Sequence, residues 1–225
     1  MSDSEGEDGL ESGTERTVVH PKRIDEVLNN PHIGFTTFHR FNGDALDASG
    51  RWPNTRENSE MVGHDGRELG YPASSVACFR WYWSKIEPER GEYRWEVIDD
   101  VLNRARERGQ RVDFRIMPHN GGDTVPEWHR TTGRGEWVDA YTESWIPDYE
   151  DPFFPETMTA LIAALGERYD GHPDVNCVDL GSVGHCGEWH TQDDELMPPT
   201  EVKLEIVDAY LEAFPRHAVA NAHWG

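Results

Sequence analysis

Residues 76–117 read VACFRWYWSKIEPERGEYRWEVIDDVLNRARERGQRVDFRIM, two strand-like runs on either side of a helix-like segment. The runs Val76–Tyr82 and Arg111–Met117 are rich in β-branched and aromatic residues. Between them, Trp95–Arg108 carries apolar residues at helical spacing, and Gly109 stands where a C-terminal cap belongs. A strand, a helix and a strand in this order predict a parallel βαβ unit.

The same alternation continues along the chain in both directions. We expect a short helix at Ile24–Leu28, a strand at Ile33–Phe38, a long loop at Asn42–Tyr71, another loop at Pro118–Pro152, a helix from Met158 to Tyr169, a strand at Val175–Leu180, a helix at Thr200–Phe214 and a strand at Ala218–Ala222. Five strands joined by four crossovers predict an α/β protein of the (β/α)8 TIM-barrel type, truncated after about five strands. The long loops follow strands, where such barrels place their active sites.

The composition indicates one domain behind an acidic tail. Residues 1–17 are mostly Ser, Gly, Asp and Glu, which is typical of a disordered segment, and residues 18–225 form the partial barrel. The net charge is −22, from 43 acidic and 21 basic residues, so phosphate would be repelled and nucleic acid is excluded as a partner. Acidic excess with only three lysines also suggests a halophilic protein, kept soluble at high salt.

Cysteines and hydropathy indicate the compartment. The three cysteines, Cys78, Cys177 and Cys186, are an odd number without zinc-ribbon spacing, so we expect free thiols. The sequence has neither a run of 18 apolar residues nor a signal peptide. We therefore predict a cytoplasmic protein with no membrane partner, and no metal or other cofactor.

The candidate catalytic residue is Glu188, in the run GSVGHCGEWH at residues 181–190 that follows an expected strand. Glycines allow close backbone approach, and an aromatic ring such as Trp189 stacks on a sugar. A carboxyl group in this setting suits the proton donor of a glycosidase. The alternative is an ordinary surface glutamate.

Arg80 is the second candidate, because it interrupts an otherwise apolar strand and a buried guanidinium needs a carboxylate partner. The partner is Glu188 or a carboxylate elsewhere, in a catalytic or a purely structural pair. Further candidates for sugar contact lie at strand ends and in loops; they are Trp83, His119, Asn120, Trp128, Trp189 and His190.

Two blocks of this sequence resemble a known family. The residues Asn30-Pro31 and Gly34-Phe35, the run Arg80–Trp95, and Tyr169–Pro173 before Gly187-Glu188-Trp189-His190 are similar to the N-terminal part of retaining glycoside hydrolase barrels of the clan A type, including the β-galactosidase-like family 42. The resemblance implies that Glu188 is the acid/base and Arg80 the arginine at the end of the second strand. Two departures stand out. Gly187 occupies the place of the family's asparagine, and the family's nucleophile belongs to a seventh strand.

The resemblance implies a glycoside hydrolase that acts on O-glycosidic bonds by a retaining mechanism. We expect this chain alone, lacking the nucleophile, to be a poor hydrolase or none, with a second chain or a missing C-terminal half completing the barrel around a carbohydrate substrate. One alternative is a non-catalytic carbohydrate-binding or interaction protein. The other is a metal hydrolase that uses His185, Cys186, Glu188 and His190.

Overall fold

The computed structural model describes residues 19–20, 23, 36–44, 73–118, 120–122, 124–139 and 143–220. The expected acidic tail, the helix at Ile24–Leu28 and most of the loop at Asn42–Tyr71 lie outside these residues. None of the helices in the described part has the length and apolar character needed to cross a bilayer.

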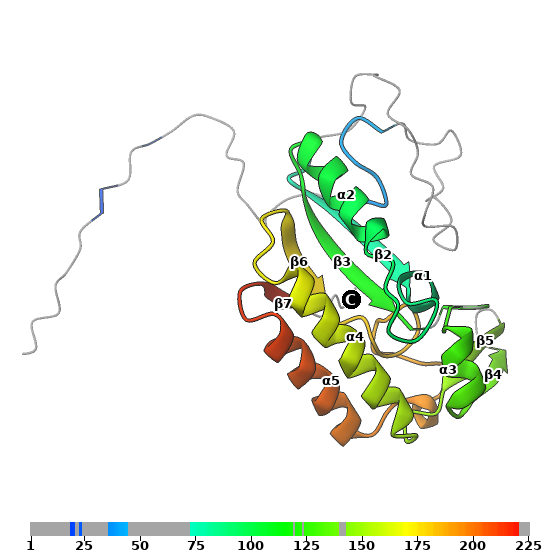
Figure 1. Cartoon of the computed structure of the whole chain (residues 1–225). Coiled ribbons are helices and arrows are strands. Elements are labelled where there is room, and N and C mark those ends of the chain that lie inside the picture. Colours follow the sequence, from blue (N-terminus) through cyan, green and yellow to red (C-terminus); the bar gives the residue numbers. More distant parts are fainter. Residues whose placement is uncertain are drawn as a thin grey trace, which may run out of the picture.

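The centre of the molecule is a parallel sheet of five strands in the order β1-β2-β3-β6-β7. The strands are β1 (Thr36–Phe38), β2 (Val76–Tyr82), β3 (Arg111–Met117), β6 (Val175–Asp179) and β7 (Ala218–Ala220). The order of these strands in the sheet is the same as their order along the chain. Every crossover therefore moves in the same direction across the sheet (Figure 1). A doubly wound sheet would reverse its order at a switch point. The sheet is therefore of the (β/α)8 barrel type.

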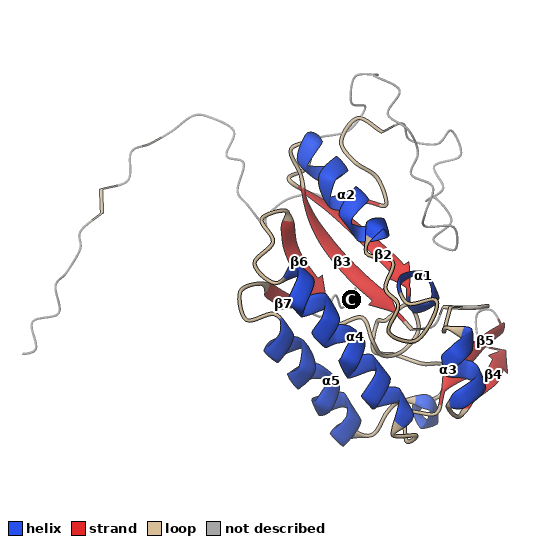
Figure 2. Ribbon diagram, viewed as in Figure 1, coloured by secondary structure: helices blue, strands red, loops and turns tan. Residues whose placement is uncertain are grey.

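Three long helices cover one face of this sheet (Figure 2). They are α2 (Glu96–Glu107), α4 (Phe153–Tyr169) and α5 (Thr200–Ala213). The expected apolar stripe of α2 is buried at Ile98, Val101, Leu102 and Ala105. Helices α4 and α5 pack closely because Gly166 has no side chain, and a methyl group there would overlap the carbonyl oxygen of Ala213. Side chains alternate along each strand, so Phe79 and Trp81 enter the helix-covered core while Arg80 points to the other face.

The three central strands and the long helices are confirmed, and the outer strands are confirmed over the residues that the structure describes, Thr36–Phe38 and Ala218–Ala220. The prediction of a loop throughout Pro118–Pro152 is wrong. This segment contains α3 (Glu127–Thr132) and an antiparallel hairpin of β4 (Gly135–Asp139) and β5 (Glu143–Pro147). The residues Trp145 and Ile146 of β5 are buried. The Trp145 ring packs against that of His129 in α3, with the ring centres 6.0 Å apart, and such a contact between separate elements leaves no local pattern in the sequence. Two shorter elements are α1 (Trp83–Ile86) and η2 (Asp194–Leu196).

Candidate active site

The segment that carries Glu188, residues 181–190, is a tight loop at the carboxyl end of β6; we call it the Glu188 loop. Two non-glycine residues in it, Cys186 and Trp189, have φ angles of 54° and 55°. Left-handed backbone at such residues costs about 1–3 kcal/mol each and is concentrated at functional sites. Hydrogen bonds hold the loop in this shape, including His185 N–H to the carbonyl of His190 at 2.8 Å and Trp189 Nε1–H to the carbonyl of Leu180 at 2.5 Å.

The conformation of Gly187 accounts for the glycine that stands here in place of the asparagine of the resembling family. Its φ is 66°, and a Cβ at this position would overlap the carbonyl group of Gly181. The loop therefore brings the backbones of residues 181 and 187 into direct contact. An asparagine at position 187 does not fit this conformation.

Glu188 lies between two arginines and a histidine. Its Oε1 accepts a hydrogen bond from Arg80 Nη1 at 2.8 Å and another from Arg115 Nη1 at 3.2 Å. Its Oε2 is 3.6 Å from His190 Nε2. The Glu188 side chain remains 23% exposed, whereas that of Arg80 is 11% exposed. Of the partners expected for Arg80, the structure shows Glu188, and the carboxyl group of Glu188 keeps access to solvent.

The sequence analysis missed Arg115 and Asp179. In the parallel register Arg80 is the partner of Arg115, so both side chains leave the sheet on the same face and reach the same carboxylate. The buried Arg115 guanidinium also contacts Asp179 Oδ2 of β6, with Nη2 at 3.1 Å. The signal was present in the sequence, because Arg115 interrupts the apolar run of β3 as Arg80 interrupts that of β2.

Asn120 joins the same group of residues. Its Nδ2 donates to the hydroxyl of Tyr82 at 3.4 Å, and its Oδ1 accepts from Cys186 Sγ at 3.0 Å. Burial raises the pKa of the Cys186 thiol, and the nearby Glu188 carboxylate raises it further. The thiol therefore stays protonated and can donate a hydrogen bond. Asn120 is therefore linked to the Glu188 loop, while its neighbour His119 lies outside the described residues.

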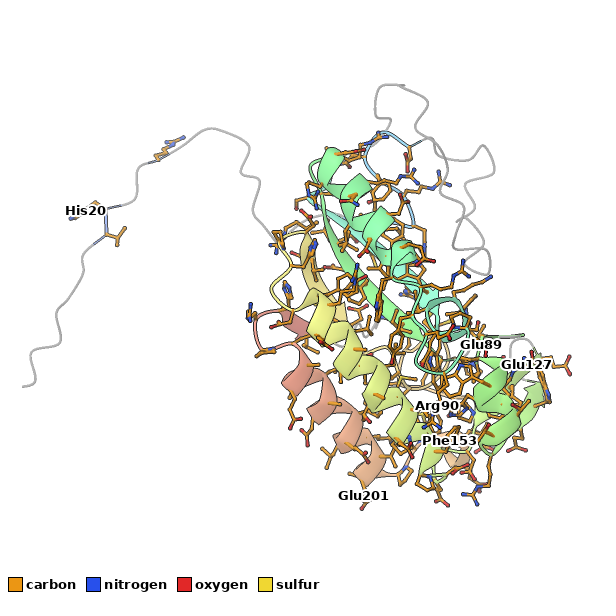
Figure 3. All side chains as sticks on the ribbon, in the orientation of Figure 1. His20, Glu89, Arg90, Glu127, Phe153 and Glu201 are labelled. Atoms are coloured by element: carbon orange, nitrogen blue, oxygen red, sulfur yellow. The ribbon has the colours of Figure 1, made fainter. Side chains whose placement is uncertain are left out.

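Two of the expected sugar-binding tryptophans lie in a different cluster. Trp83 is fully buried and donates from Nε1 to Glu87 Oε2 at 2.7 Å, and Trp128 donates to the carbonyl oxygen of Glu87 at 3.1 Å. With Trp145, Phe153 and Phe154 these two rings surround His129; we call this group the His129 cluster. At its edge the Arg90 guanidinium lies 5.1 Å from the centre of the Phe153 ring (Figure 3). This packing gives Trp83 no free ring face, so a sugar-stacking role for it has no support.

A cavity of about 420 Å³ lies between the β4–β5 hairpin and η2. Tyr149 and Met197 are among its lining residues, and the Tyr149 hydroxyl accepts a hydrogen bond from Gly184 N–H at 3.2 Å. The hairpin is thereby attached to the Glu188 loop. Among the described side chains no three His, Cys, Asp or Glu residues are arranged to hold a metal ion.

Comparisons with known proteins place these residues in context. The sequence profile of glycoside hydrolase family 42, described as beta-galactosidase, matches residues 51–189, which is more than half of the chain. Beta-galactosidase BbgII of Bifidobacterium bifidum is 27% identical over 158 residues, covering 66% of this chain and 22% of that protein.

Solved structures with a similar fold include a GH5_18 from Bifidobacterium longum subsp. infantis, with a TM-score of 0.47 and 17% identity over 65% of this chain and 34% of that one. Native xylanase 10B from Thermotoga maritima has a TM-score of 0.45 and 18% identity, over 65% of this chain and 41% of that one. This chain spans well under two thirds of the length of each of these proteins.

Proposed function

The chain belongs to glycoside hydrolase family 42, the β-galactosidases, and from this premise we propose that it carries the proton-donor half of a retaining β-galactoside hydrolase, with Glu188 as the acid/base. The observation that carries the proposal is the environment of Glu188. Its carboxyl group stands at the carboxyl end of a parallel strand, anchored through one oxygen by Arg80 and partly open to solvent. Active sites of (β/α)8 barrels occupy this end of the sheet.

A retaining hydrolase uses two carboxyl groups about 5 Å apart. In the first step Glu188 gives its proton to the glycosidic oxygen as the bond to the leaving group breaks, while an ionised carboxylate attacks the anomeric carbon. In the second step Glu188 takes a proton from the water that hydrolyses the glycosyl-enzyme. We assign the attacking carboxylate to a residue outside the described part, in the same polypeptide or in a partner chain.

Three neighbours of Glu188 are proposed to bind the sugar. Asn120 has an amide that can hydrogen-bond a hydroxyl, His190 lies beside Glu188 Oε2, and Trp189 offers an aromatic ring at the rim of the Glu188 loop. Polar side chains that converge beside an aromatic surface are typical of carbohydrate sites. Trp83 and Trp128 are not part of this proposal.

The test is hydrolysis of aryl β-D-galactosides by the wild type, Glu188→Gln and Glu195→Gln, each measured in the completed barrel, that is, with the segment or partner chain that supplies the attacking carboxylate present. Glu195 lies in η2 and is exposed, so its variant controls for loss of one negative charge. We expect the Glu188 variant to lose about 100- to 10,000-fold in kcat, the usual contribution of a general acid, with the control unchanged. If the completed barrel binds galactosides and never turns them over, with binding unaffected in Glu188→Gln, the protein is instead a carbohydrate-binding protein.

A further inference from the structure

Resting on the proposed function, we infer that Arg115 and Asp179 are positioning residues that hold the Glu188 loop and assign Oε2 of Glu188 as the oxygen that transfers the proton. Arg115 lies on β3 and Asp179 ends β6, so neither belongs to the loop that they hold.

Arg115 and Asp179 form a buried ion pair. Arg115 Nε and Nη2 lie 3.2 Å and 3.1 Å from the same oxygen, Asp179 Oδ2. The Arg115 side chain is 1% exposed and that of Asp179 is 10% exposed. A buried guanidinium with two donors directed at one carboxylate has a fixed orientation. Asp179 therefore sets the direction in which the remaining Arg115 nitrogen points.

That remaining nitrogen reaches the Glu188 loop at two points. Arg115 Nη1 donates to the carbonyl oxygen of Cys186 at 2.9 Å and to Glu188 Oε1 at 3.2 Å. One contact holds the loop backbone and the other holds the side chain of the proposed acid. Arg80 Nη1 donates to the same Oε1 at 2.8 Å, and Arg115 couples the loop backbone to this side chain.

The loop itself makes room for this contact. Gly181 stands where a Cβ would overlap Cγ of Arg115, so the stem of the arginine lies directly against the loop backbone. The same glycine contacts Gly187, the residue before Glu188. Arg115, Gly181 and Gly187 form a continuous series of close contacts that ends at the proposed acid.

The two oxygens of Glu188 are consequently not equivalent. Oε1 accepts hydrogen bonds from two guanidinium groups, which are donors only, so a proton placed on Oε1 would compete with both. Oε2 lies on the side of the exposed His190. The proton that Glu188 transfers is therefore carried on Oε2, and the glycosidic oxygen must approach from that side.

The kinetic test compares Arg115→Met, Asp179→Asn and Arg111→Met in the completed barrel, on phenyl and 2,4-dinitrophenyl β-D-galactosides. Arg111 is the matched control: it lies on the same strand but donates to the carbonyl oxygens of Pro173 and Val175. The dinitrophenolate leaves without help from an acid. We expect Arg115→Met to lose roughly 10- to 100-fold in kcat on the phenyl substrate, with little change in KM, and to stay within about threefold on the dinitrophenyl substrate. Equal losses on both substrates would overturn the positioning role.

A second measurement does not depend on turnover. Amide hydrogen exchange in the peptide that covers residues 181–190 reports how firmly the loop is held. We expect faster exchange there in Arg115→Met and Asp179→Asn, and wild-type exchange in Arg111→Met. If the loop loosens in Arg115→Met while the wild-type completed barrel hydrolyses no galactoside, the proposed reaction is wrong and the positioning contact stands. Unchanged exchange in Arg115→Met would refute the contact itself.

Discussion

His129 provides the sharpest stability prediction, because an imidazole is buried here among aromatic rings. The residue is 1% exposed, with the ring of Trp83 4.7 Å away and that of Phe153 5.0 Å away between ring centres. Neither ring nitrogen has a hydrogen-bond partner among the described residues. Burial lowers the pKa of His129 from 6.5 to about 4, although the carboxylate of Asp151 acts in the opposite direction.

The sign and size of the effect follow from proton linkage. Between its two pKa values His129 is protonated in the unfolded chain and neutral in the fold, so lowering the pH favours unfolding. The stability is complete above the unfolded value of 6.5 and declines until the pH falls to about 4. The difference between these values corresponds to roughly 3 kcal/mol in total, of which about 2 kcal/mol is lost between pH 7 and pH 5.

The variant His129→Phe removes this titration and the two unpartnered nitrogens. We expect the free energy of unfolding, measured by urea titration at constant salt, to fall by about 2 kcal/mol less between pH 7 and pH 5 than in the wild type. Phe153→Leu is the matched control, since it perturbs the same cluster without changing a titratable group. It should lower stability at both pH values and keep the wild-type difference. A His129→Phe protein with the full wild-type loss would refute the reasoning.

Three further predictions concern glycine and charge. Gly187→Ala introduces a methyl group against Gly181, so we expect loss of galactoside hydrolysis with unchanged helical circular dichroism. The control is Gly109→Ala, because Gly109 has a similar φ of 69° and no neighbour within 4 Å of an added methyl group. This variant should lose only about 1 kcal/mol of stability and no activity. Gly166→Val should separate α4 from α5 at Ala213 and lower the urea midpoint by the equivalent of about 1–3 kcal/mol. Because the net charge is −22, raising KCl to about 2 M should raise the thermal midpoint, and a higher midpoint in low salt would contradict the halophilic hypothesis.

Local sequence patterns were sufficient for most of the fold. The sequence predicts two strands with the bounds that the structure has, Val76–Tyr82 and Arg111–Met117. This is because a buried strand appears in the sequence as a short apolar run bounded by polar turns. The hairpin β4–β5 was missed. Of its two strands β5 is the buried one, where Trp145 packs against His129 of α3, and no local period records such a contact.

The candidate site likewise contains residues that the sequence indicated and residues that only the structure revealed. Glu188 and Arg80 were found from the sequence alone, because a glycine-flanked carboxyl group after a strand and a charge inside an apolar strand are unusual within a few residues. Arg115 and Asp179 required the structure: the register that pairs β2 with β3 and sets β6 beside them brings these side chains together. That register also directs both arginines to Oε1 of Glu188, whereas Oε2 lies beside His190. The sequence determined which groups were present, and tertiary packing decided how they face one another.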